Sequence, residues 1–311
     1  MMHLIHTEQV EKEALAAVSF DLAICATGFE KRATHLIQSG VLTQVKQRCA
    51  IGFYDRIDSQ RKENDVAFKA ANFELIDASG DSGRDIRLIV DRAVAELRSD
   101  TLRLVVDYSS MTRPWIGAVV EAIHSTKVGS CECYFSYSPS VFSIPGEVRP
   151  NAAVGPVQGF SSLESPEKPT ALVLGLGYER ERALGLMEYV DPALTFAFYT
   201  DPAFDPAFTK AVLKNNLGLL EGLPPENRIR HALGDLQQTG NLLGSVCAGL
   251  REEYRIILAP MGVKPFALQC LLLASRFPEL DVWRVSSGSM SDVQARPPYG
   301  PILVLKTVFA G

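Results

Sequence analysis

Short apolar runs alternate with helical patterns along the first half of the chain. In residues 84–97, apolar side chains recur every three or four positions, as in an amphipathic helix. Such alternation predicts a parallel sheet with helices on both faces. The expected strands are Leu22–Ala26, Cys49–Phe53, Glu74–Asp77, Leu102–Val106 and Cys133–Tyr137. The expected helices are Glu30–Gln38, Gln60–Asn72, Arg84–Leu97 and Arg113–His124.

The second half repeats this order of elements. The run Ile302–Val308 predicts an additional strand, antiparallel at an edge, and Phe160–Pro169 is rich in Ser, Glu and Pro and predicts a linker. We expect a loop at Glu221–Arg228. The expected strands are Leu172–Leu174, Thr195–Tyr199, Ile256–Leu258 and Asp281–Val285. The expected helices are Glu179–Tyr189, Ala207–Asn215, Leu236–Arg251 and Pro265–Arg276.

The two halves also match in sequence. "FDLAICATGFEKRA" aligns with "ALVLGLGYERERA", and "RLVVDYSSMTRPW" aligns with "RIILAPMGVKPF". Gly28 and Gly177 are 149 positions apart, Arg113 and Lys264 are 151 apart, and "VGPVQ" precedes "YGPIL" by 145. Nearly equal offsets indicate an internal duplication. We therefore expect an α/β protein of two homologous Rossmann-like repeats, 1–160 and 170–311, with mainly parallel sheets in a pseudo-two-fold arrangement.

Composition and charge exclude several classes of protein. The 311 residues are 47% hydrophobic and 22% charged, as in ordinary globular domains. A net charge of −5 does not favour non-specific binding to nucleic acid. The chain has no run of the length of a membrane span, and no basic segment followed by an apolar core opens it. We expect a cytoplasmic protein without a membrane partner.

The cysteines and the recognisable motifs predict neither a metal nor a cofactor. Six cysteines, several of them in apolar runs, read as small core residues, and the pair Cys131 and Cys133 lacks a matching Cys/His cluster. The turn "GLGYER" carries Arg180 where a dinucleotide fingerprint has its third glycine. No Ser/His/Asp order, H-E-x-x-H motif or P-loop occurs, so no catalytic residue is assigned.

Two polar turns follow predicted strands of the first half, where open α/β sheets bind ligands. The first turn holds Thr27, Gly28, Phe29, Glu30 and Arg32. A glycine lets backbone approach a ligand, and free N–H groups of a following helix suit a phosphate. A plain strand-to-helix turn is the alternative. The second half keeps Gly177 and Arg180, which favours a ligand-binding role.

The second turn, "DYSSMTR", is the sharper signal. Asp107 ends an apolar strand, where a carboxylate is costly unless it has a partner. Ser109, Ser110 and Thr112 bring hydroxyls together, and Arg113 stands at the start of the next helix. Such a set can bind a ribose and a phosphate, because the arginine fork matches phosphate oxygens. A helix cap with an exposed arginine is the alternative.

The pattern Asp107-x-Ser109-x-x-x-Arg113 resembles the signature of CARF domains, Rossmann-like sensors of cyclic oligonucleotides in CRISPR and related defence systems. The duplication resembles SAVED proteins, which fuse two CARF-like halves. The resemblance implies a cyclic-nucleotide pocket between the halves, contacted by these three residues. In the second half, Leu258 and Pro260 replace the acid and the serine, and only Lys264 keeps the cation. We therefore expect an asymmetric site dominated by the first half.

Three functions remain open on the sequence. The first is a nucleotide-binding sensor or accessory subunit of a prokaryotic defence or signalling system, working with a separate effector protein. The second is an enzyme that cleaves a phosphodiester of such a ligand, in the manner of a ring nuclease. The third is a scaffold whose polar turns only cap helices. A homo-oligomer is compatible with each of them.

Overall fold

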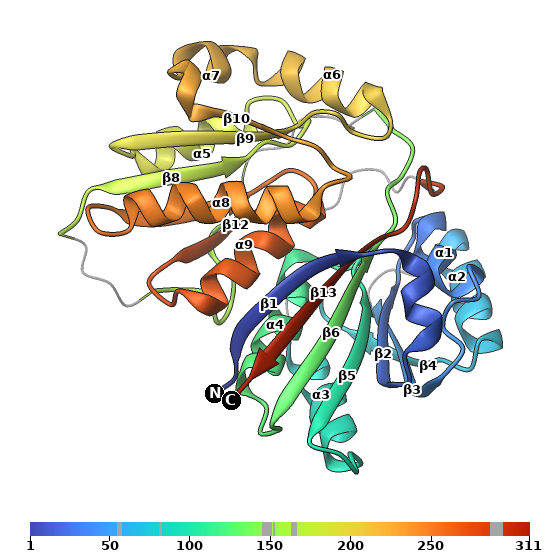
Figure 1. Cartoon of the computed structure of the whole chain (residues 1–311). Coiled ribbons are helices and arrows are strands. Elements are labelled where there is room, and N and C mark those ends of the chain that lie inside the picture. The colour runs from blue at the N-terminus through green and yellow to red at the C-terminus, as the bar shows by residue number, and fades with distance from the viewer. Residues whose placement is uncertain (55–57, 81–82, 145–150, 152, 163–166, 287–294) are drawn as a thin grey trace. The chain divides into compact units, whose positions relative to one another are not determined.

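The computed structural model divides the chain into two compact units (Figure 1). The first unit comprises Met1–Val141 and Val293–Gly311, and the second comprises Phe142–Asp292. The structure describes residues 1–54, 58–80, 83–144, 151, 153–162, 167–286 and 295–311. Each unit is a mixed α/β structure built on its own mostly parallel sheet, which confirms the predicted fold class. The pseudo-two-fold arrangement of the repeats stays a prediction.

The first unit is built on a seven-stranded sheet in the order β1-β13-β6-β5-β2-β3-β4. Strands β2 to β6 are parallel, whereas β13 is antiparallel to both of its neighbours. The strands are β1 (His3–Val10), β2 (Phe20–Thr27), β3 (Val45–Phe53), β4 (Glu74–Ala78), β5 (Thr101–Asp107), β6 (Ser130–Tyr137) and β13 (Leu303–Ala310). The helices are η1 (Lys12–Ala17), η2 (Lys31–Thr34), α1 (His35–Gln38), α2 (Ser59–Ala70), α3 (Arg84–Ala95) and α4 (Arg113–Ser125).

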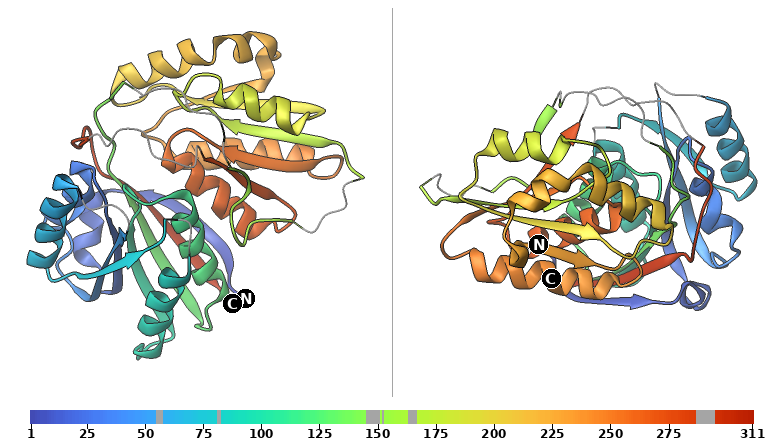
Figure 2. Two further views of the ribbon diagram at one scale, coloured as in Figure 1. Left: turned by 180° about the vertical axis from the view of Figure 1, so that it is seen from behind. Right: turned by 90° about the horizontal axis from the view of Figure 1, so that it is seen from above.

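Helices cover both faces of this sheet because its central strands are apolar on both sides. Every residue of β2 is buried. On one face, Leu15 of η1, Leu36 of α1 and Phe68 of α2 pack into a single core cluster with Ala23 and Ala50 of the strands. Helices α3 and α4 contact each other and lie together on the other face (Figure 2). This is the layering that strand–helix alternation predicts.

The second unit repeats the order of the first. Its six-stranded sheet runs β10-β9-β8-β11-β12-β7, and β7 is its antiparallel strand. The strands are β7 (Ala153–Pro156), β8 (Thr170–Gly175), β9 (Leu194–Thr200), β10 (Arg228–His231), β11 (Arg255–Pro260) and β12 (Asp281–Ser286). The helices are α5 (Arg182–Val190), α6 (Pro206–Asn215), α7 (Leu217–Gly222), η3 (Pro225–Asn227), α8 (Leu236–Leu250) and α9 (Lys264–Arg276).

The repeats exchange their last strands, so the compact units do not coincide with the sequence repeats 1–160 and 170–311, which stay a prediction. Strand β7 follows β6 in the chain but pairs with β12 of the second unit, and β13 follows β12 but pairs with β6 of the first unit. The run Ile302–Val308 is therefore an antiparallel strand, as expected, but it lies between β1 and β6 and not at an edge. The chain passes between the units at Val141 and at Val293, and not at the predicted linker, of which residues 163–166 lie outside the described residues.

Three further local features differ from the sequence predictions. The charged N-terminal stretch forms β1, an edge strand whose alternation is weak. Part of the predicted loop Glu221–Arg228 is the short helix η3, and β10 begins at its last residue. The predicted helix Glu30–Gln38 is a 3₁₀ turn followed by one α-helical turn.

In the described part of the chain, no helix has the length and hydrophobicity needed to cross a membrane.

Candidate functional site

The carboxyl ends of β2 and β5 diverge in the first unit. The chain leaves β2 toward β3 and β4 on one side and returns to β5 and β6 on the other, so the β2–β5 boundary is the switch point of the sheet. The two strands pair only from Leu22–Leu104 to Ile24–Val106, although β2 continues to Thr27 alongside β3 and β5 continues to Asp107. This divergence lies at the edge where open α/β sheets bind ligands.

The corresponding boundary of the second unit is closed. Strands β8 and β11 pair as far as Gly175 and Pro260, and the Met261 N–H then donates to the Gly175 carbonyl at 2.9 Å. A Cβ on Gly177 would lie 2.8 Å from the Met261 carbonyl oxygen, so the two turns are in tight backbone contact. The two units therefore differ in how far these strands pair, and the asymmetric ligand site stays a prediction.

Ten polar side chains are buried at or near the carboxyl edge of the first sheet. Burial of a polar group lowers stability unless it is hydrogen-bonded, and such clusters accumulate at functional sites. They come from the ends of β2, β5 and β6 and from α2. The buried polar residues here are Thr27, Glu30, Arg32, Arg61, Asn64, Asp107, Ser109, Ser136, Ser138 and Ser140.

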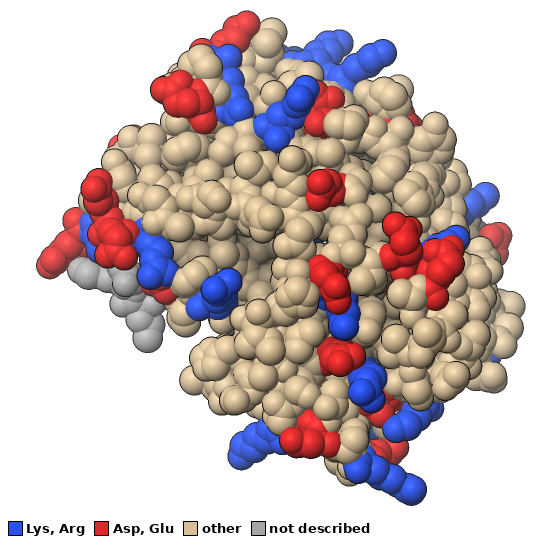
Figure 3. Space-filling model, viewed as in Figure 1, with Lys and Arg blue, Asp and Glu red and all other residues tan. Residues whose placement is uncertain are grey.

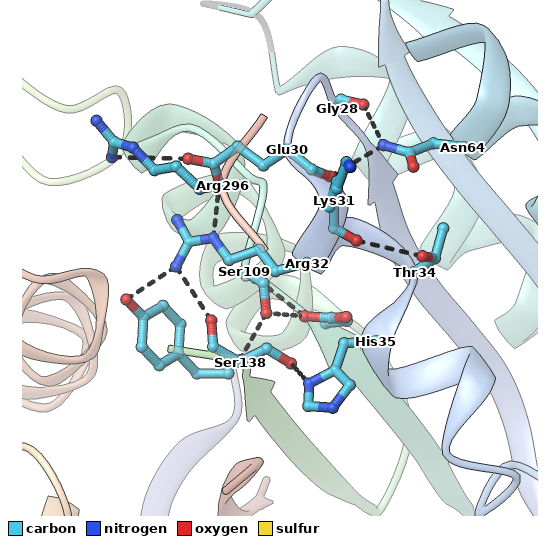
Figure 4. A network of polar contacts seen from close by, with 12 residues as sticks. Gly28, Glu30, Lys31, Arg32, Thr34, His35, Asn64, Ser109, Ser138 and Arg296 are labelled. Atoms are coloured by element: carbon cyan, nitrogen blue, oxygen red, sulfur yellow. Dashed lines mark hydrogen bonds and ion pairs between the residues drawn. The ribbon is translucent and has the colours of Figure 1, made fainter. Parts of the chain in front are cut away.

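Arg32 lies at the centre of one network (Figure 4). Its Nε donates to Glu30 at 2.7 Å, and its Nη1 donates to the Tyr137 hydroxyl at 3.1 Å and to the Ser138 carbonyl at 3.0 Å. Burial opposes the charge of Arg32, but Glu30 and Tyr137 outweigh it and raise the pKa of the guanidinium. Arg296 approaches the same carboxylate at 3.7 Å. The sequence predicted that Arg32 would face a ligand, whereas the structure turns it toward these protein groups.

The β5 turn is held by its own hydroxyl groups. The Ser109 hydroxyl donates to Asp107 Oδ1 at 2.5 Å and accepts from the Ser138 N–H at 2.8 Å. The Thr112 hydroxyl donates to the Gly80 carbonyl and caps α4 by accepting from the Trp115 N–H. Through these hydrogen bonds the turn after β5 connects the carboxyl ends of β5, β6 and β4. The cap of α4 is therefore Thr112, whereas Asp107 and Ser109 hold the turn through their contact with each other.

Gly28 and Ser110 bring the two predicted turns together. A Cβ on Gly28 would lie 3.0 Å from the Ser110 Cβ, so these turns touch at the switch point. The Ser110 hydroxyl is buried and has no hydrogen-bond partner among the described residues. The half-buried Phe29 stacks on Phe53, with their ring centroids 6.3 Å apart. The two turns of the sequence prediction are therefore in direct contact.

The segment after Gly28 differs from the phosphate-binding helix that the sequence suggests. Its first turn is a 3₁₀ helix of four residues, and Glu30 occupies its N-cap position. A carboxylate at this end disfavours an anion there. Arg113, by contrast, begins the 13-residue helix α4, so it stands at a full helix N-terminus at the same edge.

The sequence reasoning missed an asparagine that fixes this turn in both units. The Asn64 side chain donates to the Gly28 and Glu30 carbonyls at 2.7 and 3.0 Å. The Asn216 side chain donates to the Gly177 carbonyl at 2.8 Å. The two asparagines are 152 positions apart, close to the 149 that separate the glycines. The repeat offset could therefore have identified them.

A second chain of polar contacts, centred on the buried Arg61, supports the other side of the turn. The Thr27 hydroxyl donates to Asp65 at 2.5 Å, and Arg61 binds both Asp65 at 2.7 Å and Asp77 at 2.9 Å. A Cβ on Gly52 would overlap the Arg61 guanidinium, so this position on β3 must be glycine for Arg61 to lie there. The guanidinium is neutralised by its own neighbours.

The remaining predicted residues of the second unit lie further from such contacts. Arg180 is exposed and pairs with Glu181 at 3.0 Å. Lys264 begins α9, as Arg113 begins α4. The repeat correspondence of the two cations is therefore preserved in the fold, whereas Arg180 lies on the surface.

A different buried cluster occupies the carboxyl edge of the second sheet. His231 ends β10, and its ring nitrogens lie 3.2 Å from the Thr200 hydroxyl and 3.1 Å from the Thr239 hydroxyl. Because the Thr239 hydroxyl donates to the Asp235 carbonyl, it accepts from His231 Nδ1, which therefore carries a proton. Burial lowers the pKa of His231 to about 4. The sequence analysis did not single out this residue.

The described residues hold no cluster of metal ligands, and the face drawn in Figure 3 has no basic patch. Within the described residues, no group of three or more His, Cys, Asp or Glu side chains could hold a metal ion. All six cysteines are buried and unbridged. Acidic and basic side chains are intermingled on the face that Figure 3 shows.

Comparisons with known proteins do not assign the chain to a family. No family model matches the chain, and no curated protein matches it. Among solved structures, a similar chain is phosphoethanolamine N-methyltransferase 1 of Haemonchus contortus, in complex with phosphoethanolamine and S-adenosylhomocysteine. The two chains are 6% identical over 95% of this chain and 90% of the other, with a TM-score of 0.26.

Proposed function

We propose that the first unit binds a nucleotide-type ligand at the diverging ends of β2 and β5, and that the protein acts as a sensor or accessory subunit. The observation that carries this proposal is the divergence itself, because the equivalent strands of the second unit stay paired to their ends. The ligand would lie against the Gly28 and Ser110 turns, close to the start of α4. The resemblance of Asp107, Ser109 and Arg113 to the CARF signature supports a cyclic oligonucleotide and a role in prokaryotic defence.

The contacts of the β5 turn favour binding over catalysis. Ser109 and Thr112 already use their hydroxyls to hold the turn, so neither is poised as a nucleophile. Arg113 at the helix N-terminus supplies positive charge for a phosphate. Cleavage of a phosphodiester remains the alternative activity, and consumption of the ligand distinguishes the two.

The test is thermal melting of the protein against a panel of cyclic and linear oligonucleotides. We expect one ligand, at saturating concentration, to raise the melting temperature by several degrees. Arg113→Ala should abolish this rise, and the matched variant Lys264→Ala should keep it, since only the first half has the acid and the serine of the signature beside its cation. Chromatography of the mixture then shows whether the ligand is intact, as for a sensor, or cleaved, as for an enzyme.

No rise with any oligonucleotide would contradict the proposal. Equal losses in both variants would contradict the asymmetry and indicate that the two units contribute alike.

A further inference from the structure

The sheet of the first unit is completed by the tail of the second repeat. Strand β13 pairs with β6 from Leu303–Tyr137 to Ala310–Ser130, and it pairs with β1 on its other side. Four of its side chains are fully buried: Val304, Leu305, Thr307 and Phe309. A strand paired on both sides and buried on its apolar face is an integral part of the sheet and not an appendage.

The residues before β13 also dock on the first unit. The Arg296 carbonyl accepts from the Arg32 N–H at 3.1 Å, and the Pro297 carbonyl accepts from the Val141 N–H at 3.2 Å. The Tyr299 N–H donates to the Pro139 carbonyl at 2.9 Å. The second repeat thereby brings Arg296 to Glu30, inside the polar network of the first unit.

The tail of the first repeat does the same for the second unit. Strand β7 pairs with β12, and the hydrogen bonds continue beyond it: Val157 donates to the Val282 carbonyl at 2.7 Å, and Val282 donates to the Phe160 carbonyl at 2.9 Å. Val157 and Phe160 are both buried. Upstream of β7, the Phe142 ring packs against Phe208 with centroids 5.1 Å apart.

The exchange has a physical consequence. A repeat that kept its own tail would cover its own β6 or β12 edge, and the two repeats would be independent domains. Instead, each repeat by itself exposes an unpaired sheet edge and an apolar tail, and only the other repeat covers both. Exchange of an identical element between two protomers is the arrangement of a domain-swapped dimer.

We propose that the two repeats are a strand-exchanged pair whose association does not depend on the covalent link between them. The tail of the second repeat, β13, inserts between β6 and β1 of the first repeat. The tail of the first repeat, β7, pairs with the edge strand β12 of the second repeat. This inference is independent of the proposed ligand.

The test cuts the full chain after it has folded. A specific protease sequence is inserted between Ser162 and Glu167, within the stretch that the sequence predicts as a linker, and the cleaved protein is passed over a size-exclusion column. We expect both fragments in a single peak at the mass of the intact chain, 34.0 kDa, and two peaks only in denaturant. Separate peaks in native buffer would overturn the proposal.

Two neighbouring residues of β13 provide a matched control in the cleaved protein. Leu305 is fully buried, whereas Lys306 is partly exposed and pairs with Glu8 at 3.3 Å. Leu305→Ala should weaken the association of the fragments about 30-fold or more, and Lys306→Ala by less than about fivefold. Equal effects would show that the buried strand does not hold the fragments together. Should Leu305→Ala fail to fold before cleavage, the proposal is still decided by whether the fragments of the cleaved wild type elute together.

Discussion

Acidification should destabilise the second unit through His231. The ring is buried between Thr200 and Thr239, and its pKa is lowered from 6.5 to about 4 by burial. Between these two values the unfolded chain holds a proton on this residue that the folded unit does not, so the stability present at neutral pH is lost as the pH falls from 6.5 toward 4. The full loss is about 3 kcal/mol, since each pKa unit corresponds to about 1.4 kcal/mol. The side chain is almost fully buried, so solvent screening takes little from this figure.

The assay is urea-induced unfolding between pH 7.5 and pH 4, followed by the fluorescence of Trp283. The chain contains two tryptophans, and Trp115→Phe removes the one in the first unit. His231→Gln should be less stable than the parent at neutral pH, because the paired hydroxyls lose their partner. As the pH falls to 4, the free energy of unfolding of the parent should fall by about 3 kcal/mol relative to that of the variant, since glutamine does not titrate. Parallel pH profiles of the two proteins would refute the reasoning.

Two further predictions concern buried contacts at the sheet edges. Asn64→Ala and Asn216→Ala should each lower the free energy of unfolding of their own unit by about 1–3 kcal/mol, because each leaves a buried turn carbonyl without its donor; unchanged urea midpoints would contradict this. Glu30→Gln should cost about 3–5 kcal/mol, because Arg32 is buried and loses its carboxylate, whereas Glu181→Gln breaks only a surface pair and should cost less than about 1 kcal/mol. Similar losses in these two variants would show that burial of the Glu30 pair is energetically unimportant.

Much of the fold was available from local patterns. The strands of both sheets, except β1, β7 and β10, coincide with apolar runs, and the amphipathic periods give α3 and α4 nearly to the residue. The repeat offset relates Gly28 to Gly177 and Arg113 to Lys264, and the matched strand orders of the two sheets agree with it. These features are local because the spacing of apolar side chains within an element shows which of its faces is buried.

The candidate site was only half determined in this way. Residue types and the rule that ligands bind at strand ends pointed to the Gly28 and Asp107 turns. The orientation of Arg32 depended on Tyr137, which is 105 positions away, and on Arg296 near the end of the chain. No local pattern shows that an arginine next to a glutamate will be buried against a distant tyrosine instead of facing a ligand.

The sequence by itself determined the elements, their duplication and the position of the polar turns. The tertiary structure alone decided that β13 completes the first sheet and β7 the second, and that β2 and β5 diverge while β8 and β11 stay paired. The physical reason is that an apolar alternating segment specifies a strand but not its neighbour. Two sheet edges, those of β6 and β12, were available to each tail, and the choice between them rests on long-range pairing and packing that no window of sequence contains.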